Sequence, residues 1–233
     1  MDHRSAILEA ATELLEASPS GDISTRGVGD RAGVQQPVIY RLFGDKDGLL
    51  AAVVDHGFGR YVAAKRAAEP SDDPVADLRR GWDEHTRFAL EHPNLYRLMY
   101  TPKLASRPQA VGEAHDLLRA VLERIARIGR LTIEPARAAD IVMSANSGVA
   151  LALISRPEAH RDVALSTQVR EIVLPGILTP EPDTDRTPAP PTTAHAATTL
   201  GALLRSGPPG TFSPAELQLL TEWLLRLADL HKP

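Results

Sequence analysis

Residues 31–50 read RAGVQQPVIYRLFGDKDGLL, and this stretch decides the fold. Two of its three glycines, Gly33 and Gly44, flank a short apolar segment. Glycine is common just after the end of a helix because it adopts the left-handed backbone conformation at little cost. We therefore expect Gly33 to end one helix, a second to run from about Gln35 to Phe43, and Gly44 to close it. Two short helices joined by a tight turn indicate a helix-turn-helix.

The flanking residues support this interpretation. Ser24 is a good N-cap for the helix that ends at Gly33. Ile23 and Val28 are spaced to pack together at its start. Asp45 is expected to cap a further helix that continues to about Ala68. Before the motif, one long helix is predicted from apolar residues at helical spacing: Ile7, Leu8, Ala11, Leu14 and Leu15.

The rest of the chain also reads as helix, so the predicted fold class is all-α. Residues 1–48 are expected to form a helix-turn-helix domain, and 49–233 an all-helical domain for ligand binding and dimerisation. The segment 179–192 is rich in proline and is predicted to be a loop. Prolines mark most of the expected helix boundaries. The remaining helices are predicted at 74–91, 93–100, 108–129, 135–155, 160–174, 193–205 and 213–230, the last with a capping box at Ser213 and Glu216.

Composition narrows the class of protein. The 233 residues include no cysteine, which excludes disulfides and thiolate metal sites. No run of 18 apolar residues predicts a membrane span, and the N-terminus lacks the apolar stretch of a signal peptide. A cytoplasmic protein without a membrane partner is therefore expected.

The third predicted helix carries the candidate DNA contacts. Five apolar residues would pack it and its neighbour inward: Val28, Ala32, Val34, Ile39 and Phe43. Glutamine pairs with adenine and valine touches the thymine methyl, while Arg26, Tyr40, Arg41 and Lys46 have the chemistry for phosphates. The expected DNA-binding residues are Ser24, Thr25, Arg26, Gln35, Gln36, Val38, Tyr40, Arg41 and Lys46.

Two spaced patterns resemble the TetR family of transcriptional regulators. One is RxxILxAAxxLL at residues 4–15, and the other is the 31–50 stretch with Tyr40, Phe43, Lys46 and Leu49 in the family's spacing. The segment HPNLYRLMY at 92–100 is also similar to part of the family's sensor domain. The resemblance implies a repressor that binds a near-palindromic operator as a homodimer and responds to a small-molecule ligand.

The sequence departs from that pattern at two positions, and its N-terminal region has a small net negative charge. Gln35 stands where the family usually has a serine or threonine N-cap, and Gly29 where alanine is usual. Residues 1–60 hold six basic and nine acidic side chains. DNA-binding domains are normally basic, so we expect few phosphate contacts and a modest salt dependence.

Polar residues on apolar helix faces suggest a ligand pocket in the larger domain. The candidates are Trp82, His85, His115 and Asn146. The alternative is that each is a satisfied core or boundary residue. His85 and His92 form too poor a ligand set to predict a metal site. The last helix is apolar around more than half of its circumference and is a candidate dimer interface, as is the helix at 135–155.

No motif of nucleotide binding, calcium binding or nucleophilic catalysis is complete, so neither an enzyme nor a cofactor is expected. The other function class is a helical protein-interaction module without DNA binding. Specific binding to a palindromic duplex separates that module from a repressor.

Overall fold

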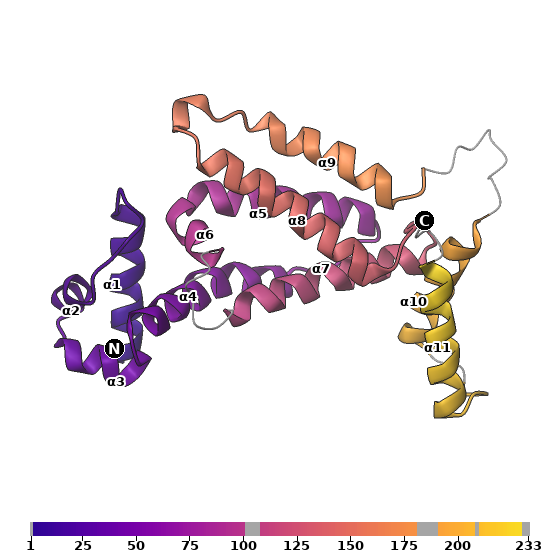
Figure 1. Ribbon diagram of the computed structural model, residues 1–233, viewed down its shortest axis with the longest axis horizontal. Coiled ribbons are helices and arrows are strands. Elements are labelled where there is room, and N and C mark those ends of the chain that lie inside the picture. The colour runs from indigo at the N-terminus through magenta and orange to yellow at the C-terminus, as the bar shows by residue number, and fades with distance from the viewer. Residues whose placement is uncertain (1, 101–107, 181–190, 208–209, 230–233) are drawn as a thin grey trace. The chain divides into compact units, whose positions relative to one another are not determined.

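In the computed structural model, described residues 2–100, 108–180, 191–207 and 210–229 contain helices and no strand (Figure 1). Leu131 and Leu178 form one isolated antiparallel bridge. The helices are α1 (His3–Ala17), α2 (Thr25–Ala32), α3 (Gln36–Phe43), α4 (Lys46–Ala67), α5 (Pro74–Glu91), α6 (Pro93–Met99), α7 (Gln109–Arg127), α8 (Pro135–Ile154), the 3-10 turn η1 (Glu158–His160), α9 (Ala164–Ile177), α10 (Thr193–Ser206) and α11 (Pro214–Ala228).

The predicted all-α class is confirmed, and most predicted boundaries agree within two residues. The helix expected at 160–174 is wrong at both ends. It begins at Ala164 after a separate 3-10 turn, and it continues through Pro175 to Ile177. The last turn survives the proline because the Leu178 amide donates to the Leu174 carbonyl. Most of the predicted loop, residues 181–190, lies outside the described residues.

By their contacts, the described residues group into two compact units. The first unit comprises residues 1–69, 84–117 and 150–162, and the second comprises 70–83, 118–149 and 163–233. Helices α5, α7 and α8 contribute residues to both. This grouping differs from a division at residue 48, which stays a prediction about where the two functions reside.

The core of the first unit joins the N-terminal helices to α6. Helices α1 to α3 pack with one another and against the start of α4 (Figure 1). The buried side chains include Ile7, Leu15, Ile39 and Phe58. The buried Asn94 amide on α6 donates to the carbonyls of Leu15 and Ser18, both at 2.8 Å. Because a helix C-terminus leaves carbonyls unpaired, this amide completes the end of α1 and fixes it to α6.

A buried carboxylate organises part of the second unit. Burial by itself raises the pKa of Asp77, but hydrogen bonds from Ser71 and the Arg124 and Arg80 guanidiniums outweigh it and hold that pKa at about 2. The Arg124 Nη1–Asp77 Oδ2 distance is 2.7 Å. The Asp77 carboxylate is therefore buried but fully partnered, by a hydroxyl and by two arginines that reach solvent, and a partnered ion is tolerated where an unpaired one is not.

Helices α10 and α11 lie side by side as a hairpin in the second unit (Figure 1). Ser213 and Glu216 form the predicted capping box at the start of α11. The small shared core contains Ala197, Leu204 and Leu224. Many other large apolar side chains of the hairpin remain exposed.

One described helix, α8, is long and apolar enough to cross a membrane by its composition alone. Half of the tested window is buried within the protein. Core helices of soluble proteins have the same composition, so this observation is weak evidence for a membrane span.

Candidate DNA-binding surface

The α2–turn–α3 segment has the geometry of a helix-turn-helix. The Ser24 hydroxyl accepts from the Gly27 amide at 3.0 Å and caps α2, as predicted. Gly33 ends α2 with φ of +68°, a conformation that side-chain-bearing residues rarely adopt. A Cβ atom on Gly29 would lie 2.8 Å from the Val34 carbonyl oxygen. The turn therefore passes too close to α2 for the alanine that is usual at position 29.

The residues expected to pack α3 inward do so. Val28 and Ile39 are fully buried, and Ala32, Val34 and Phe43 are partly buried against the same core. Val38, which was expected to face DNA, is also partly buried against this core, so it offers less surface than an exposed valine. Gln35 precedes α3 without a side-chain capping bond, as its residue type suggested.

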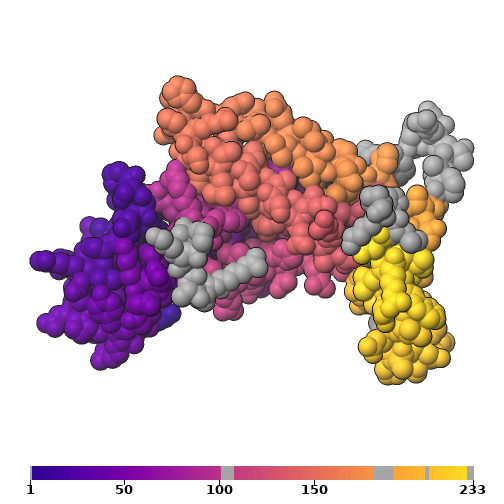
Figure 2. All heavy atoms as spheres, in the orientation of Figure 1, coloured from indigo at the N-terminus to yellow at the C-terminus, as the bar shows by residue number. Residues whose placement is uncertain are grey.

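The opposite side of α3 is exposed. Gln36, Tyr40 and Arg41 all lie there, and the Tyr40 side chain is 45% exposed. In the space-filling view the segment from α1 to α3, drawn in indigo and purple, lies open to solvent (Figure 2). Nearly half of the Tyr40 side chain is therefore accessible to a partner.

Thr25 connects the start of α2 to this face. The Gln36 Nε2 atom donates to Thr25 Oγ1 at 3.2 Å. The Tyr40 hydroxyl lies 3.4 Å from the same oxygen, and either group has a proton to donate. These three residues thus form one polar group on the surface, although 11 and 15 positions separate Thr25 from the two α3 residues.

Some of the nearby cations already have partners. Lys46 Nζ pairs with Asp22 Oδ1 at 2.7 Å, and Arg31 pairs with Glu13 at 2.6 Å. Within the described part of the chain, no ion pair involves Arg26 or Arg41. The arginines are therefore the cations most available to phosphates, and Lys46 must first leave Asp22.

The candidate pocket residues fall in two groups. In the second unit the buried Trp82 indole donates to the Ser166 hydroxyl at 2.9 Å, and the Asn146 amide donates to the Trp82 carbonyl at 3.4 Å. In the first unit His85 is buried and lies 2.7 Å from the Tyr96 hydroxyl, while His115 is partly buried. These bonds give Trp82 and His85 a structural role, whether or not a ligand also meets them.

Burial, together with the positive charge of Lys65, lowers the pKa of His85 to about 3. The imidazole is therefore neutral at physiological pH. Burial also lowers the pKa of Lys65 to about 8, although the nearby Glu84 carboxylate opposes this shift. A neutral imidazole beside a partly desolvated ammonium is a polar group within an apolar wall.

Sequence reasoning missed Tyr61, which stacks on Phe58 near His85. Its hydroxyl is buried and makes no hydrogen bond in the described structure. Nothing in the sequence singled it out, because a tyrosine at helical spacing reads as an ordinary core residue. Across the described residues, no three His, Asp or Glu side chains gather closely enough to hold a metal ion.

Comparison with known proteins assigns the N-terminal region. Residues 7–53 match the family model described as bacterial regulatory proteins, tetR family. This range spans α2, α3, the turn between them and most of α1. The family groups regulatory proteins, in agreement with the expectation that the chain is not an enzyme.

Two similar proteins each match part of the chain. The nucleoid occlusion factor SlmA of Marinomonas sp. is 25% identical over 134 residues, 54% of this chain and 66% of its own. The HTH-type transcriptional repressor Rv3405c of Mycobacterium tuberculosis is 33% identical over 82 residues, 35% of this chain and 42% of its own. The chain thus matches less than two thirds of the length of either relative.

Solved structures extend the likeness in fold beyond the N-terminal helices. The transcriptional regulator FadR of Bacillus subtilis superposes with a TM-score of 0.63 at 17% identity, covering 74% of this chain and 98% of its own. With the helix-turn-helix geometry, the matched motif leads to one conclusion: residues 7–53 form a helix-turn-helix region that matches the tetR family of bacterial regulatory proteins.

Proposed function

We propose that this protein is a sequence-specific DNA-binding repressor whose third helix reads the major groove. The observation that carries the proposal is the exposed face of α3, with Gln36, Tyr40 and Arg41, on a helix-turn-helix that matches the family model. On this proposal Gln36 contacts base edges, while Arg26, Arg41 and Lys46 contact phosphates. Such a role belongs in the cytoplasm, where the chromosome is.

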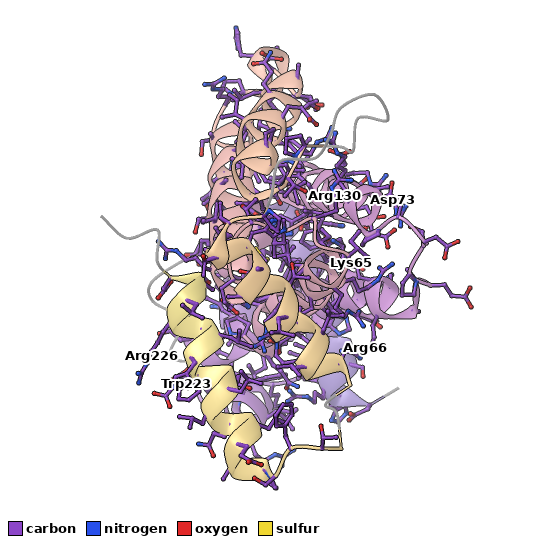
Figure 3. All side chains as sticks on the ribbon, turned by 90° about the vertical axis from the view of Figure 1, so that its right-hand side faces the viewer. Lys65, Arg66, Asp73, Arg130, Trp223 and Arg226 are labelled. Atoms are coloured by element: carbon purple, nitrogen blue, oxygen red, sulfur yellow. The ribbon has the colours of Figure 1, made fainter. Side chains whose placement is uncertain are left out.

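The exposed hairpin supports a homodimer. Leu219, Trp223 and Leu227 recur every four residues along α11 and form one stripe. Trp223 is 51% exposed and extends with Arg226 from the outer side of α11 (Figure 3). Clusters of exposed apolar side chains mark interfaces. Among the described residues of the hairpin region, seven large apolar side chains are exposed: Leu200, Leu203, Phe212, Leu219, Trp223, Leu225 and Leu227.

The charges beside this stripe suit a second copy of the chain. Glu222 and Arg226 form an ion pair next to Trp223. In an antiparallel pairing centred near Trp223, Arg226 of one copy lies beside Glu222 of the partner subunit. A two-fold interface is self-complementary in this way. Two recognition helices then read two half-sites of a near-palindromic operator.

Ligand control is the third part of the proposal. The fold neighbour FadR was solved in complex with stearoyl-CoA. In this chain, the His85–Tyr96 bond ties α5 to α6, and Asn94 ties α6 to the end of α1. A ligand that engages His85 competes with Tyr96 and shifts α6. The ligand releases DNA only when it binds the shifted arrangement better than the DNA-bound one.

The first prediction tests DNA recognition by selection of bound sequences from random duplexes. Arg41→Ala weakens binding to all sequences alike, since phosphate contacts carry no sequence information. Gln36→Ala lowers discrimination at one base pair per half-site by roughly 1–3 kcal/mol. If the wild type selects no sequence and neither variant alters affinity, the chain is an interaction module without DNA binding.

The second prediction concerns the partner of Lys46. Asp22→Asn frees the ammonium for phosphate, so random duplex DNA binds more tightly and the slope of log K against log salt steepens by about 0.9. The matched control is Glu9→Gln, which removes the same charge from an exposed position on α1. Equal effects of the two variants would show that the ion pair does not restrain Lys46.

The third prediction tests the dimer and its interface by light scattering. Trp223→Glu buries a charge in the proposed interface and yields monomers at micromolar concentration, with unchanged helix content. Ala152→Glu places the same charge on an exposed position of α8, the other predicted interface, and leaves the dimer intact. The reverse pattern assigns the interface to α8, and a monomeric wild type refutes dimerisation.

The fourth prediction tests ligand control with a thermal-shift library that includes stearoyl-CoA. A compound that raises the melting temperature is expected to change operator affinity. Trp82→Phe and His115→Gln are expected to alter that response while leaving affinity without the compound nearly unchanged. Stabilisation with no change in operator affinity counts against ligand control, as does a parallel loss of DNA binding and stability in both variants.

A further inference from the structure

Thr25 lies beside the exposed face of α3, although it belongs to another helix. It begins α2, yet its hydroxyl oxygen accepts from the Gln36 amide at 3.2 Å and lies 3.4 Å from the Tyr40 hydroxyl. Gln36 and Tyr40 are one helical turn apart on α3, so both reach the same side. Gln36 itself is exposed, so no packing holds its amide.

We propose that Thr25 is a positioning residue that sets the base preference of Gln36 by holding its amide in one orientation. The inference rests on the proposed DNA-binding function of α3. It assigns to Thr25 a role in specificity, distinct from a phosphate contact that would act on all sequences.

The chemistry follows from the number of donors on the amide. A glutamine side chain has two N–H donors and one carbonyl acceptor. The Thr25 oxygen takes one N–H, which leaves one N–H and the carbonyl for DNA. Adenine presents an acceptor at N7 beside a donor at N6 in the major groove, and this pair matches the two remaining groups.

Guanine presents two acceptors, N7 and O6, in the same place. The carbonyl oxygen of the held Gln36 amide would then face guanine O6. Both atoms are acceptors, so no hydrogen bond forms between them. A freely rotating amide avoids this by turning both N–H groups toward guanine. The Thr25 bond therefore favours adenine over guanine, and it lowers the cost of ordering the side chain on binding.

The experiment compares the wild type with Gln36→Ala, Thr25→Val and Thr25→Ser. The duplexes carry A or G at the base pair where Gln36→Ala changes the preference. Thr25→Val keeps the branched shape but removes the hydroxyl, and it lowers the preference for A over G by roughly 2- to 12-fold, as for one hydrogen bond. Thr25→Ser keeps the hydroxyl and retains the preference. Circular dichroism and thermal melting show that each variant is folded.

A double variant separates positioning from direct contact. In the Gln36→Ala background, Thr25→Val has no further effect on the A over G preference, because the group that it orients is gone. An additive loss in the double variant, or an equal loss on all sequences from Thr25→Val alone, overturns the proposal and makes Thr25 a contact residue.

The results that would overturn the proposed function differ from those that would overturn the role of Thr25 alone. If Gln36→Ala leaves every base preference unchanged, α3 does not read DNA through Gln36, and the role of Thr25 falls with it. If Gln36→Ala removes a preference but Thr25→Val leaves that preference intact, the function stands and only the positioning role is wrong.

Discussion

Two close backbone approaches hold α3 at its two ends, and the exposed face of the helix depends on them. A Cβ atom would lie 2.8 Å from the Val34 carbonyl at Gly29, before α3, and 2.0 Å from the Phe43 carbonyl at Gly48, after it. Both distances are shorter than a side chain tolerates. With Ile39 buried between them, the helix has little freedom to rotate, so the side chains opposite Ile39 keep a fixed direction.

Hydrogen bonds that satisfy the end of a helix also connect the N-terminal helices to α6. Asn94 supplies donors to two carbonyls at the end of α1, and its own carbonyl accepts from Arg97 at 2.9 Å. Removing such an amide leaves buried acceptors without partners, which costs more than the bond itself contributes. The N-terminal helices are thus not a detachable module resting on the remainder of the first unit.

Much of the fold could be predicted because the residues that begin and end its helices act locally. Gly33, Gly44, Ser24 and Asp45 each act on the turn in which they stand, and the structure confirms all four boundaries. The predicted helix end at residue 174 is wrong, because the helix continues through Pro175 to Ile177. The Thr25–Gln36 bond and the Lys46–Asp22 pair join residues 11 and 24 positions apart, so no local pattern encodes them. The roles of the predicted site residues remain predictions.

The pairing of Lys46 with Asp22 and of Arg31 with Glu13 has a consequence for how a regulator searches a chromosome. A chromosome offers millions of competing sites, and attraction to phosphates alone determines how long a protein lingers at each one. A surface whose cations are partly neutralised leaves random DNA quickly and spends more of its time unbound. On the proposed function, few copies per cell would suffice only where the operator supplies strong base contacts, so control would be confined to a small number of well-matched sites.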